Sequence, residues 1–213
     1  MSPDYEYFIA LEPYQTIGHT HKGLLLQALP ISVILLILLH LIMRPLAAHL
    51  PSVFHLDVRA SHLIRHFGFR NVKNWIVFFV SVALGFYSHI FVDAFTHQSG
   101  YFVMRYPVLQ KTYGSIPLYK LLQYGLSLIG LAAQGFLIVV LLIKTPGTAK
   151  NFRKIDSKRK LYYWLVVLIT GIAVVIAKLL FTSSTNVAGI IVVSSISGFF
   201  VGLIAASVIF RGE

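Results

Sequence analysis

Five long apolar runs alternate with polar segments along this chain. They cover residues 24–43, 74–94, 121–143, 162–180 and 187–210. Each run is close to the roughly 20 residues that a helix needs to cross the hydrocarbon core of a membrane. No linker, low-complexity tract or internal repeat divides the chain. The pattern therefore predicts an all-α fold, a bundle of about five transmembrane helices that forms a single transmembrane domain over residues 1–213.

The segments between these runs differ in composition. Residues 1–23 are polar and aromatic, residues 44–73 and 144–160 are basic, and residues 95–120 are rich in aromatic and turn-forming side chains. The first apolar run ends without a small-residue cleavage site, so it is expected to be retained and not removed as a signal peptide. Within the first basic segment, residues 53–67 have the pattern of a short amphipathic helix at the membrane interface.

The overall composition supports membrane insertion and narrows the chemistry. Hydrophobic residues make up 57% of the chain and charged residues 12%, whereas soluble domains carry about 25% charged residues. There are no cysteines. Thiolate catalysis, disulfides and cysteine-ligated metal sites are therefore excluded, and any metal has to be held by His, Asp, Glu or backbone oxygen.

The net charge of +11 is explained by membrane topology and not by nucleic-acid binding. Thirteen of the 18 Lys and Arg residues lie in the segments 44–73 and 144–160 or at Arg211, which fall on one side if five helices alternate. Basic segments stay cytoplasmic, so the N-terminus is expected outside and the C-terminus inside. Membrane lipids, especially those with anionic headgroups, are the expected partners of these segments.

The end of the second apolar run carries an unusual set of ionisable residues. His89, Asp93 and His97 are spaced four residues apart and so share one face of a helix. Ionisable groups at membrane depth are costly, by about 2.5 kcal/mol or more for a charged one. A metal ion or a network of polar partners would compensate for this cost.

The alternation of spans places residues 1–23, the end of the second run and residues 95–120 on the same outer side. A divalent ion, with zinc the expected one, favours mixed imidazole and carboxylate ligands. We predict that Asp4, His19, His89 and Asp93 are its ligands. We predict that His97 or Glu6 acts as a proton shuttle or an extra ligand. Such an ion would activate water and polarise an ester or phosphoryl oxygen.

Each of these residues also has a purely structural interpretation. His89 and Asp93 would satisfy each other by a hydrogen bond, Asp4 would cap a helix, and Glu6 would be a solvated acid in a first helical turn. His97 at the interface would simply be solvated. The histidines of the basic side are expected to be solvated as well, namely His49, His55, His62 and His66.

Four separated blocks resemble a known family. They are Ser2-Pro3-Asp4-Tyr5-Glu6-Tyr7-Phe8, His19-Thr20 with Gly23, the stretch 88–97 and the stretch 116–124. Over about residues 1–135 the chain resembles the bacterial membrane family catalogued as domain of unknown function 4184, and it is similar to inner-membrane proteins called metal-dependent hydrolases. The resemblance implies a metal site in a multi-pass protein of the bacterial inner membrane. Relatives usually begin with an upstream Phe-Ser/Thr-His-Pro block, whose histidine is an expected ligand and has no counterpart here.

The function expected from these features is that of a membrane-embedded metal-dependent hydrolase acting on a lipid-linked phosphoester. One alternative is a transporter in which the ionisable residues relay protons or bind a cation, although such a path would need polar residues at several depths. The other alternative is a non-catalytic membrane protein.

Overall fold

The structure, a computed structural model, describes residues 2–65, 68–69, 71–148 and 154–211. The part of the chain so described contains five helices long and apolar enough to cross a membrane. The predicted all-α bundle is therefore confirmed. The five spans are His21–His49, Val72–Arg105, Leu118–Lys144, Ser157–Phe181 and Val187–Ile209.

Most of these spans are single helices. The first consists of α2 (His21–Gly23), a π-helical turn (Leu24–Ala28) and α3 (Leu29–His49). The second contains α5 (Val72–Thr96) followed by α6 (Tyr101–Arg105). The other three are α8 (Leu118–Lys144), α9 (Ser157–Phe181) and α10 (Val187–Ile209).

Short elements fill the ends of the bundle. A 3-10 turn (Ser2–Asp4) leads into α1 (Tyr5–Ala10). The predicted amphipathic segment forms a 3-10 turn (Val53–His55) and α4 (Leu56–Arg65), and residues 66–67 lie outside the described residues. Between α6 and α8 lie α7 (Pro107–Gln110) and a small antiparallel hairpin of β1 (Thr112–Tyr113) and β2 (Ile116–Pro117).

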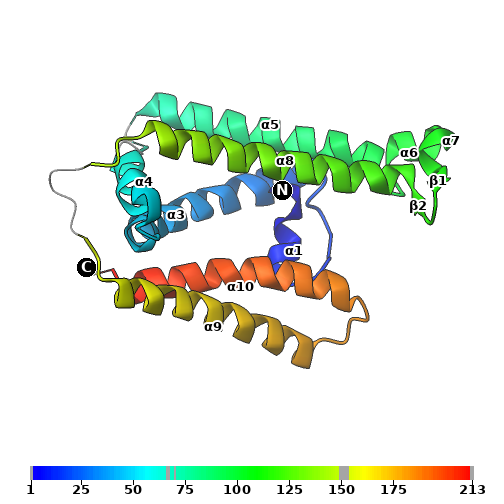
Figure 1. The fold of residues 1–213 in the computed structure, drawn as a ribbon. Helices are drawn as coiled ribbons and strands as arrows, with labels where there is room; N and C mark the ends of the chain where they lie inside the picture. The colour runs from blue at the N-terminus through cyan, green and yellow to red at the C-terminus, as the bar shows by residue number, and fades with distance from the viewer. Residues whose placement is uncertain (1, 66–67, 70, 149–153, 212–213) are drawn as a thin grey trace.

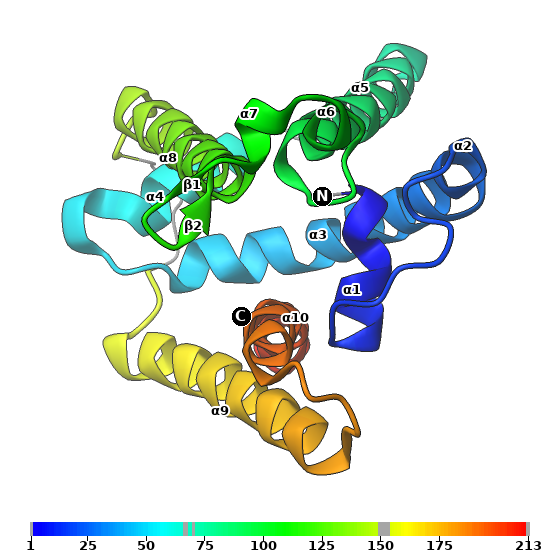
Figure 2. The same ribbon diagram turned by 90° about the vertical axis from the view of Figure 1, so that its right-hand side faces the viewer.

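The helices form two pairs with α3 between them. Figures 1 and 2 show α5 and α8 on one side of α3 and the α9–α10 hairpin on the other. Two glycines allow the backbones of the hairpin to touch. A Cβ on Gly202 would lie 2.5 Å from the carbonyl oxygen of Val167, and one on Gly198 would lie 2.8 Å from that of Gly171. Small residues at such crossings are typical of membrane helices.

The helix α4 ties together the ends of three spans at the basic end of the molecule. Its Asp57 is only 2% exposed, is paired with Lys160 of α9 and accepts a 2.8 Å hydrogen bond from Ser52. Burial alone would raise the pKa of Asp57, but the hydrogen bonds from Lys160 and Ser52 hold it below its ordinary value. Arg59 donates to three carbonyl oxygens at the end of α8, those of Leu142, Ile143 and Thr145.

One expectation for this end was wrong, because His49 is not solvated. Its side chain is 1% exposed and stacks on Tyr163, with ring centroids 4.5 Å apart. Its Nδ1 lies 2.7 Å from the carbonyl oxygen of Pro45. The reason is that α3 continues to residue 49, so that this position faces α9 and not the following loop.

The N-terminal segment runs from the hairpin to α5 and so connects the two pairs of helices. Ser197 of α10 donates to the carbonyl oxygen of Phe8 at 2.9 Å, and Lys178 of α9 donates to that of Ala10 at 2.9 Å. The hydroxyl of Tyr5 lies 3.1 Å from that of Ser32 in α3. These contacts fix α1 and the turn before it, and that turn carries Asp4 to α5.

Candidate metal centre

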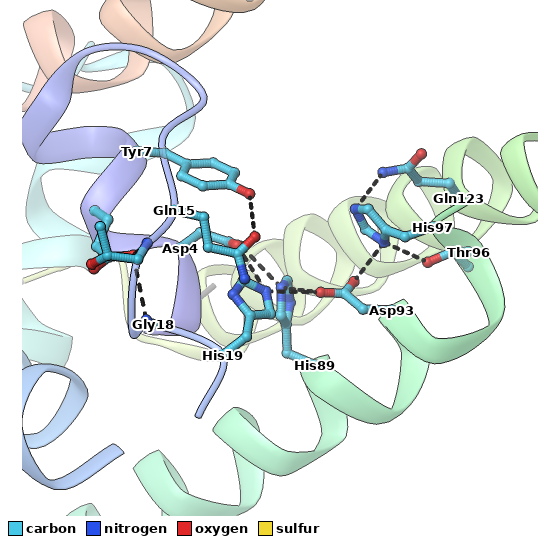
Figure 3. A network of polar contacts seen from close by, with 12 residues as sticks. Asp4, Tyr7, Gln15, Gly18, His19, His89, Asp93, Thr96, His97 and Gln123 are labelled. Atoms are coloured by element: carbon cyan, nitrogen blue, oxygen red, sulfur yellow. Dashed lines mark hydrogen bonds and ion pairs between the residues drawn. The ribbon is translucent and has the colours of Figure 1, made fainter. Parts of the chain in front are cut away.

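Four ionisable side chains from three separate segments converge beside α5 (Figure 3). The Nε2 atom of His89 lies 3.0 Å from Asp4 Oδ2 and 3.0 Å from Asp93 Oδ2. The Nε2 atom of His19 lies 3.4 Å from Asp4 Oδ1 and 3.1 Å from Asp93 Oδ2. Both imidazoles therefore direct Nε2 toward the same two carboxylates. The structure brings together all four residues that the sequence predicts as ligands.

Helix α5 supplies two of them from one face. His89 and Asp93 are separated by four residues, so their side chains lie one above the other. His89 comes seven residues before Thr96, the last residue of α5, which places it about 10 Å inside that end. The site is therefore recessed from the end of the helix.

Asp4 occupies the position before α1, where a helix cap would be expected. Its side chain makes no capping hydrogen bond to α1. Its two carboxylate oxygens instead point to the imidazoles of His19 and His89. The capping interpretation of Asp4 is therefore not supported by its contacts, and its carboxylate belongs to the cluster.

His19 is presented by a loop that is tightly held in place. A Cβ on Gly18 would lie 2.2 Å from the carbonyl oxygen of Pro3, so only glycine allows the loop to approach the segment that carries Asp4. Similarly, a Cβ on Gly23 would lie 2.1 Å from the carbonyl oxygen of Ile17. These two close approaches set the distance between His19 and Asp4.

Glu6 lies next to the cluster but contacts the loop. Its carboxylate accepts hydrogen bonds from the backbone N–H of Thr16 at 2.6 Å, Ile17 at 3.2 Å and Gly18 at 3.3 Å, and from the Thr16 hydroxyl. Burial alone would raise the pKa of Glu6, but these hydrogen bonds hold it below its ordinary value. Its contacts are those of a residue that shapes the loop before His19, and its catalytic role stays a prediction.

His97 links the cluster to α8. Its Nδ1 lies 3.4 Å from Asp93 Oδ1, and its Nε2 lies 3.3 Å from the amide nitrogen of Gln123. The amide oxygen of Gln123 accepts a 3.0 Å hydrogen bond from Lys120. Because an ammonium group can only donate, the amide oxygen has to face Lys120 and the NH2 group has to face His97. His97 therefore accepts at Nε2 and carries its proton on Nδ1, the atom that lies near Asp93 Oδ1 and Thr96 Oγ1.

The sequence analysis did not include Gln123 or Lys120 in the site. Both belong to the stretch 116–124 that carries the family resemblance, and they lie three residues apart on one face of α8. The sequence feature that could have identified them is a pair of polar residues at the start of an apolar helix. What it could not show was that this turn of α8 lies beside the end of α5.

The donor set suits a bound cation, whereas three of the four imidazole–carboxylate distances are those of hydrogen-bonded pairs and are shorter than an ion would require. A tetrahedral ion with bonds of about 2.0–2.2 Å holds its ligand atoms about 3.3–3.6 Å apart. The four imidazole–carboxylate distances lie between 3.0 and 3.4 Å. One ligand atom from each of Asp4, His19 and His89 also lies within 4.8 Å of the others. The side chains of the four residues are 17–24% exposed, so water can reach them.

The surroundings of the cluster carry negative charge. Burial, followed by the charges of Asp4, Asp93 and Glu6, raises the pKa of the Tyr7 phenol above its ordinary value. A field that opposes the formation of a phenolate also attracts cations. The electrostatics and the geometry therefore favour the same kind of ligand.

A model of one protein family, described as Domain of unknown function (DUF4184), matches residues 1–208 of the chain. The match includes the last two helices, which the resemblance read from the sequence did not cover. Neither the curated proteins nor the solved structures contain a match.

Proposed function

The chain belongs to the DUF4184 family, whose description assigns no activity, and from the geometry of its site we propose that it is a membrane-embedded metal-dependent hydrolase. One observation carries this proposal. Two imidazole Nε2 atoms, brought from two segments, each lie 3.0–3.4 Å from the carboxylates of Asp4 and Asp93, and one ligand atom from each of Asp4, His19 and His89 lies within 4.8 Å of the others. This donor set is suited to a divalent ion such as zinc.

In this proposal Asp4, His19, His89 and Asp93 would hold the ion. When bound, such an ion lowers the pKa of a coordinated water toward about 7 and polarises an ester or phosphoryl oxygen. His97 lies beside one oxygen of Asp93, and the other oxygen of Asp93 is directed at the two imidazoles. We assign His97 a positioning role on this basis, and its role as a proton shuttle stays a prediction.

We propose a lipid-linked phosphoester as the substrate. The site is recessed by about 10 Å from the end of α5, near the level at which lipid headgroups lie. Three basic residues, Arg105, Lys111 and Lys120, belong to the same end of the chain and would attract an anionic substrate. The opposite end carries the basic segments, so we further propose that the site faces the outer side of a bacterial inner membrane, with the C-terminus cytoplasmic.

Elemental analysis tests the metal site directly. The protein is purified without chelators in a mild detergent, as wild type and as the variants His89→Ala and Asp93→Ala. His21→Ala serves as the matched control, because this histidine lies close to the site but contacts Tyr87 and not the carboxylates. We expect about one equivalent of metal in the wild type and the control, and little in the two ligand variants at unchanged helical content. Wild-type protein without metal would refute the proposal.

An activity assay tests the reaction class. Phospholipid and prenyl-phosphate analogues are incubated with protein stripped of metal and with protein reloaded with zinc. Hydrolysis that returns on reloading supports the hydrolase, whereas metal binding without hydrolysis of any phosphoester would limit the proposal to a cation site. A liposome flux assay then tests the transporter alternative.

A further inference from the structure

We propose that an anionic phospholipid binds at the opposite end of the molecule, between α3, α4 and the end of α10, with Arg44 at its centre. This proposal is independent of the metal site. It rests on two neighbouring pockets that share Arg44, and on the fact that no described residue gives the arginines that line them an acidic partner. Figure 1 shows this end, where α4 and the C-terminal end of α10 lie.

The first pocket is lined mostly by hydrogen-bond donors. It has a volume of about 370 Å³ and lies between α3 and α4, with Arg44, Ser61, Ile64 and Arg65 as its walls. Ser61 and Arg65 are one turn apart on α4 and face Arg44 of α3. Two guanidinium groups and one hydroxyl converge there, which suits the oxygens of a phosphate group.

The second pocket lies on the other side of Arg44. It has a volume of about 450 Å³ and combines the cations Arg44 and Arg211 with an apolar wall that includes Leu41, Ile155 and Phe210. His49 lines the same pocket, and its Nε2 atom is buried without a hydrogen-bond partner in the described part of the chain. A polar group of a bound lipid would give this atom a partner.

The three arginines have no acidic partner in the described part of the chain. Among residues 2–65, 68–69, 71–148 and 154–211, no carboxylate lies within ion-pair distance of Arg44, Arg65 or Arg211. The neighbouring cations are committed elsewhere, Lys160 to Asp57 and Arg59 to the carbonyl oxygens of α8. Three further cations, Arg44, Arg65 and Arg211, line the two pockets, at an end of the molecule that also carries exposed cations such as Lys158.

The position of Arg44 points to a lipid and not to a free anion. Arg44 lies five residues before the end of α3, about 8 Å inside it, where a long side chain reaches the headgroup level. A free phosphate would use the guanidinium groups but not the apolar wall. A phospholipid uses both, because its phosphate and its acyl chains meet at this depth.

Titration with phosphatidylglycerol tests the proposal on the full chain. The wild type and the variants Arg44→Gln, Arg65→Gln and Arg211→Gln are purified in an uncharged detergent, and bound lipid is counted by native mass spectrometry. Phosphatidylcholine and inorganic phosphate are the comparison ligands. Lys158→Gln is the matched control, because Lys158 is an exposed cation near this end that lines neither pocket.

We expect phosphatidylglycerol to bind more tightly than phosphatidylcholine, with a loss of about fivefold for each arginine removed. Arg44→Gln should have the largest effect, since it affects both pockets, and Lys158→Gln should have none. Because these arginines are exposed, the variants should elute as the wild type does in gel filtration. Equal binding of the two lipids, an equal loss in Lys158→Gln, or displacement of phosphatidylglycerol by an equal concentration of inorganic phosphate would each overturn the proposal.

Discussion

The variant Gln123→Leu tests whether α8 takes part in the metal centre. Leucine is close to glutamine in size, but it can neither accept from Lys120 nor donate to His97 Nε2. Without the amide, His97 loses the contact that keeps its proton on Nδ1 and holds its ring beside Asp93 Oδ1. All four proposed ligands remain in place, so any change in metal affinity comes from their orientation.

The expected loss of zinc affinity is about tenfold. Groups that orient metal ligands typically contribute 10- to 100-fold to affinity. Here the hydrogen bond between Gln123 and His97 is long, at 3.3 Å, His97 Nδ1 is 3.4 Å from Asp93 Oδ1, and the His97 side chain is 44% exposed, all of which favours the lower value. A net contribution of about 1.4 kcal/mol is also near the upper range for a single hydrogen bond.

Competition with a chromophoric zinc chelator measures this difference in detergent-solubilised protein. Gln134→Leu is the matched control, because Gln134 is an exposed glutamine on the same helix and is not part of the cluster. Lys120→Met should give a smaller loss, since it removes only the group that orients the amide. Wild-type affinity in Gln123→Leu, or an equal loss in Gln134→Leu, would refute the reasoning.

Three further predictions concern residues that hold the candidate metal centre and the helix α4 in place. Gly18→Ala should abolish metal binding, because its Cβ would lie 2.2 Å from the Pro3 carbonyl oxygen, whereas Gly125→Ala, with nothing within 4 Å, should bind metal as the wild type does. Asp57→Asn should lower the free energy of unfolding by about 3–5 kcal/mol, since it leaves Lys160 buried without its charge partner. Because the pKa of Asp57 is lowered in the folded protein, the stability that its charge contributes should be present at neutral pH and be lost as the pH falls below about 4. Thermal unfolding measured against pH should show this loss in the wild type and not in Asp57→Asn. Arg59→Gln should increase hydrogen exchange at residues 141–145, where its guanidinium binds the last carbonyl groups of α8.

The spans could be predicted from the sequence because burial in a membrane requires long uninterrupted apolar runs. All five predicted runs correspond to helices of the structure, and the predicted all-α fold is confirmed. The ends of the helices could not be predicted equally well. Polar residues such as His49 and Lys160 were assigned to loops, yet α3 and α9 continue through them, because His49 bonds to a carbonyl of its own helix and stacks on Tyr163, and Lys160 pairs with Asp57. Hydrophobicity alone does not contain that information.

The members of the cluster could be predicted for a related reason. A charged group at membrane depth needs a partner, and the alternation of the spans places Asp4, His19 and the pair on α5 on one side. The roles of Glu6 and His97 could not be derived in this way. Both are ionisable and lie on the correct side, but Glu6 binds three successive backbone N–H groups and His97 is turned toward Gln123. Residue type shows that a partner is needed, whereas the tertiary structure decides which partner it is.

The same physical cause underlies the two proposed sites. At one end, the partners of Asp4 and Asp93 in the described part of the chain include imidazoles, which are neutral unless they are protonated. At the other end, Arg44, Arg65 and Arg211 have no acidic partner in the described part of the chain. Charge is therefore gathered near the membrane boundary at both ends, negative at the first and positive at the second. Such charge is costly unless a ligand of opposite sign compensates it, so a cation is the ligand to be expected at the first end and an anionic headgroup at the second.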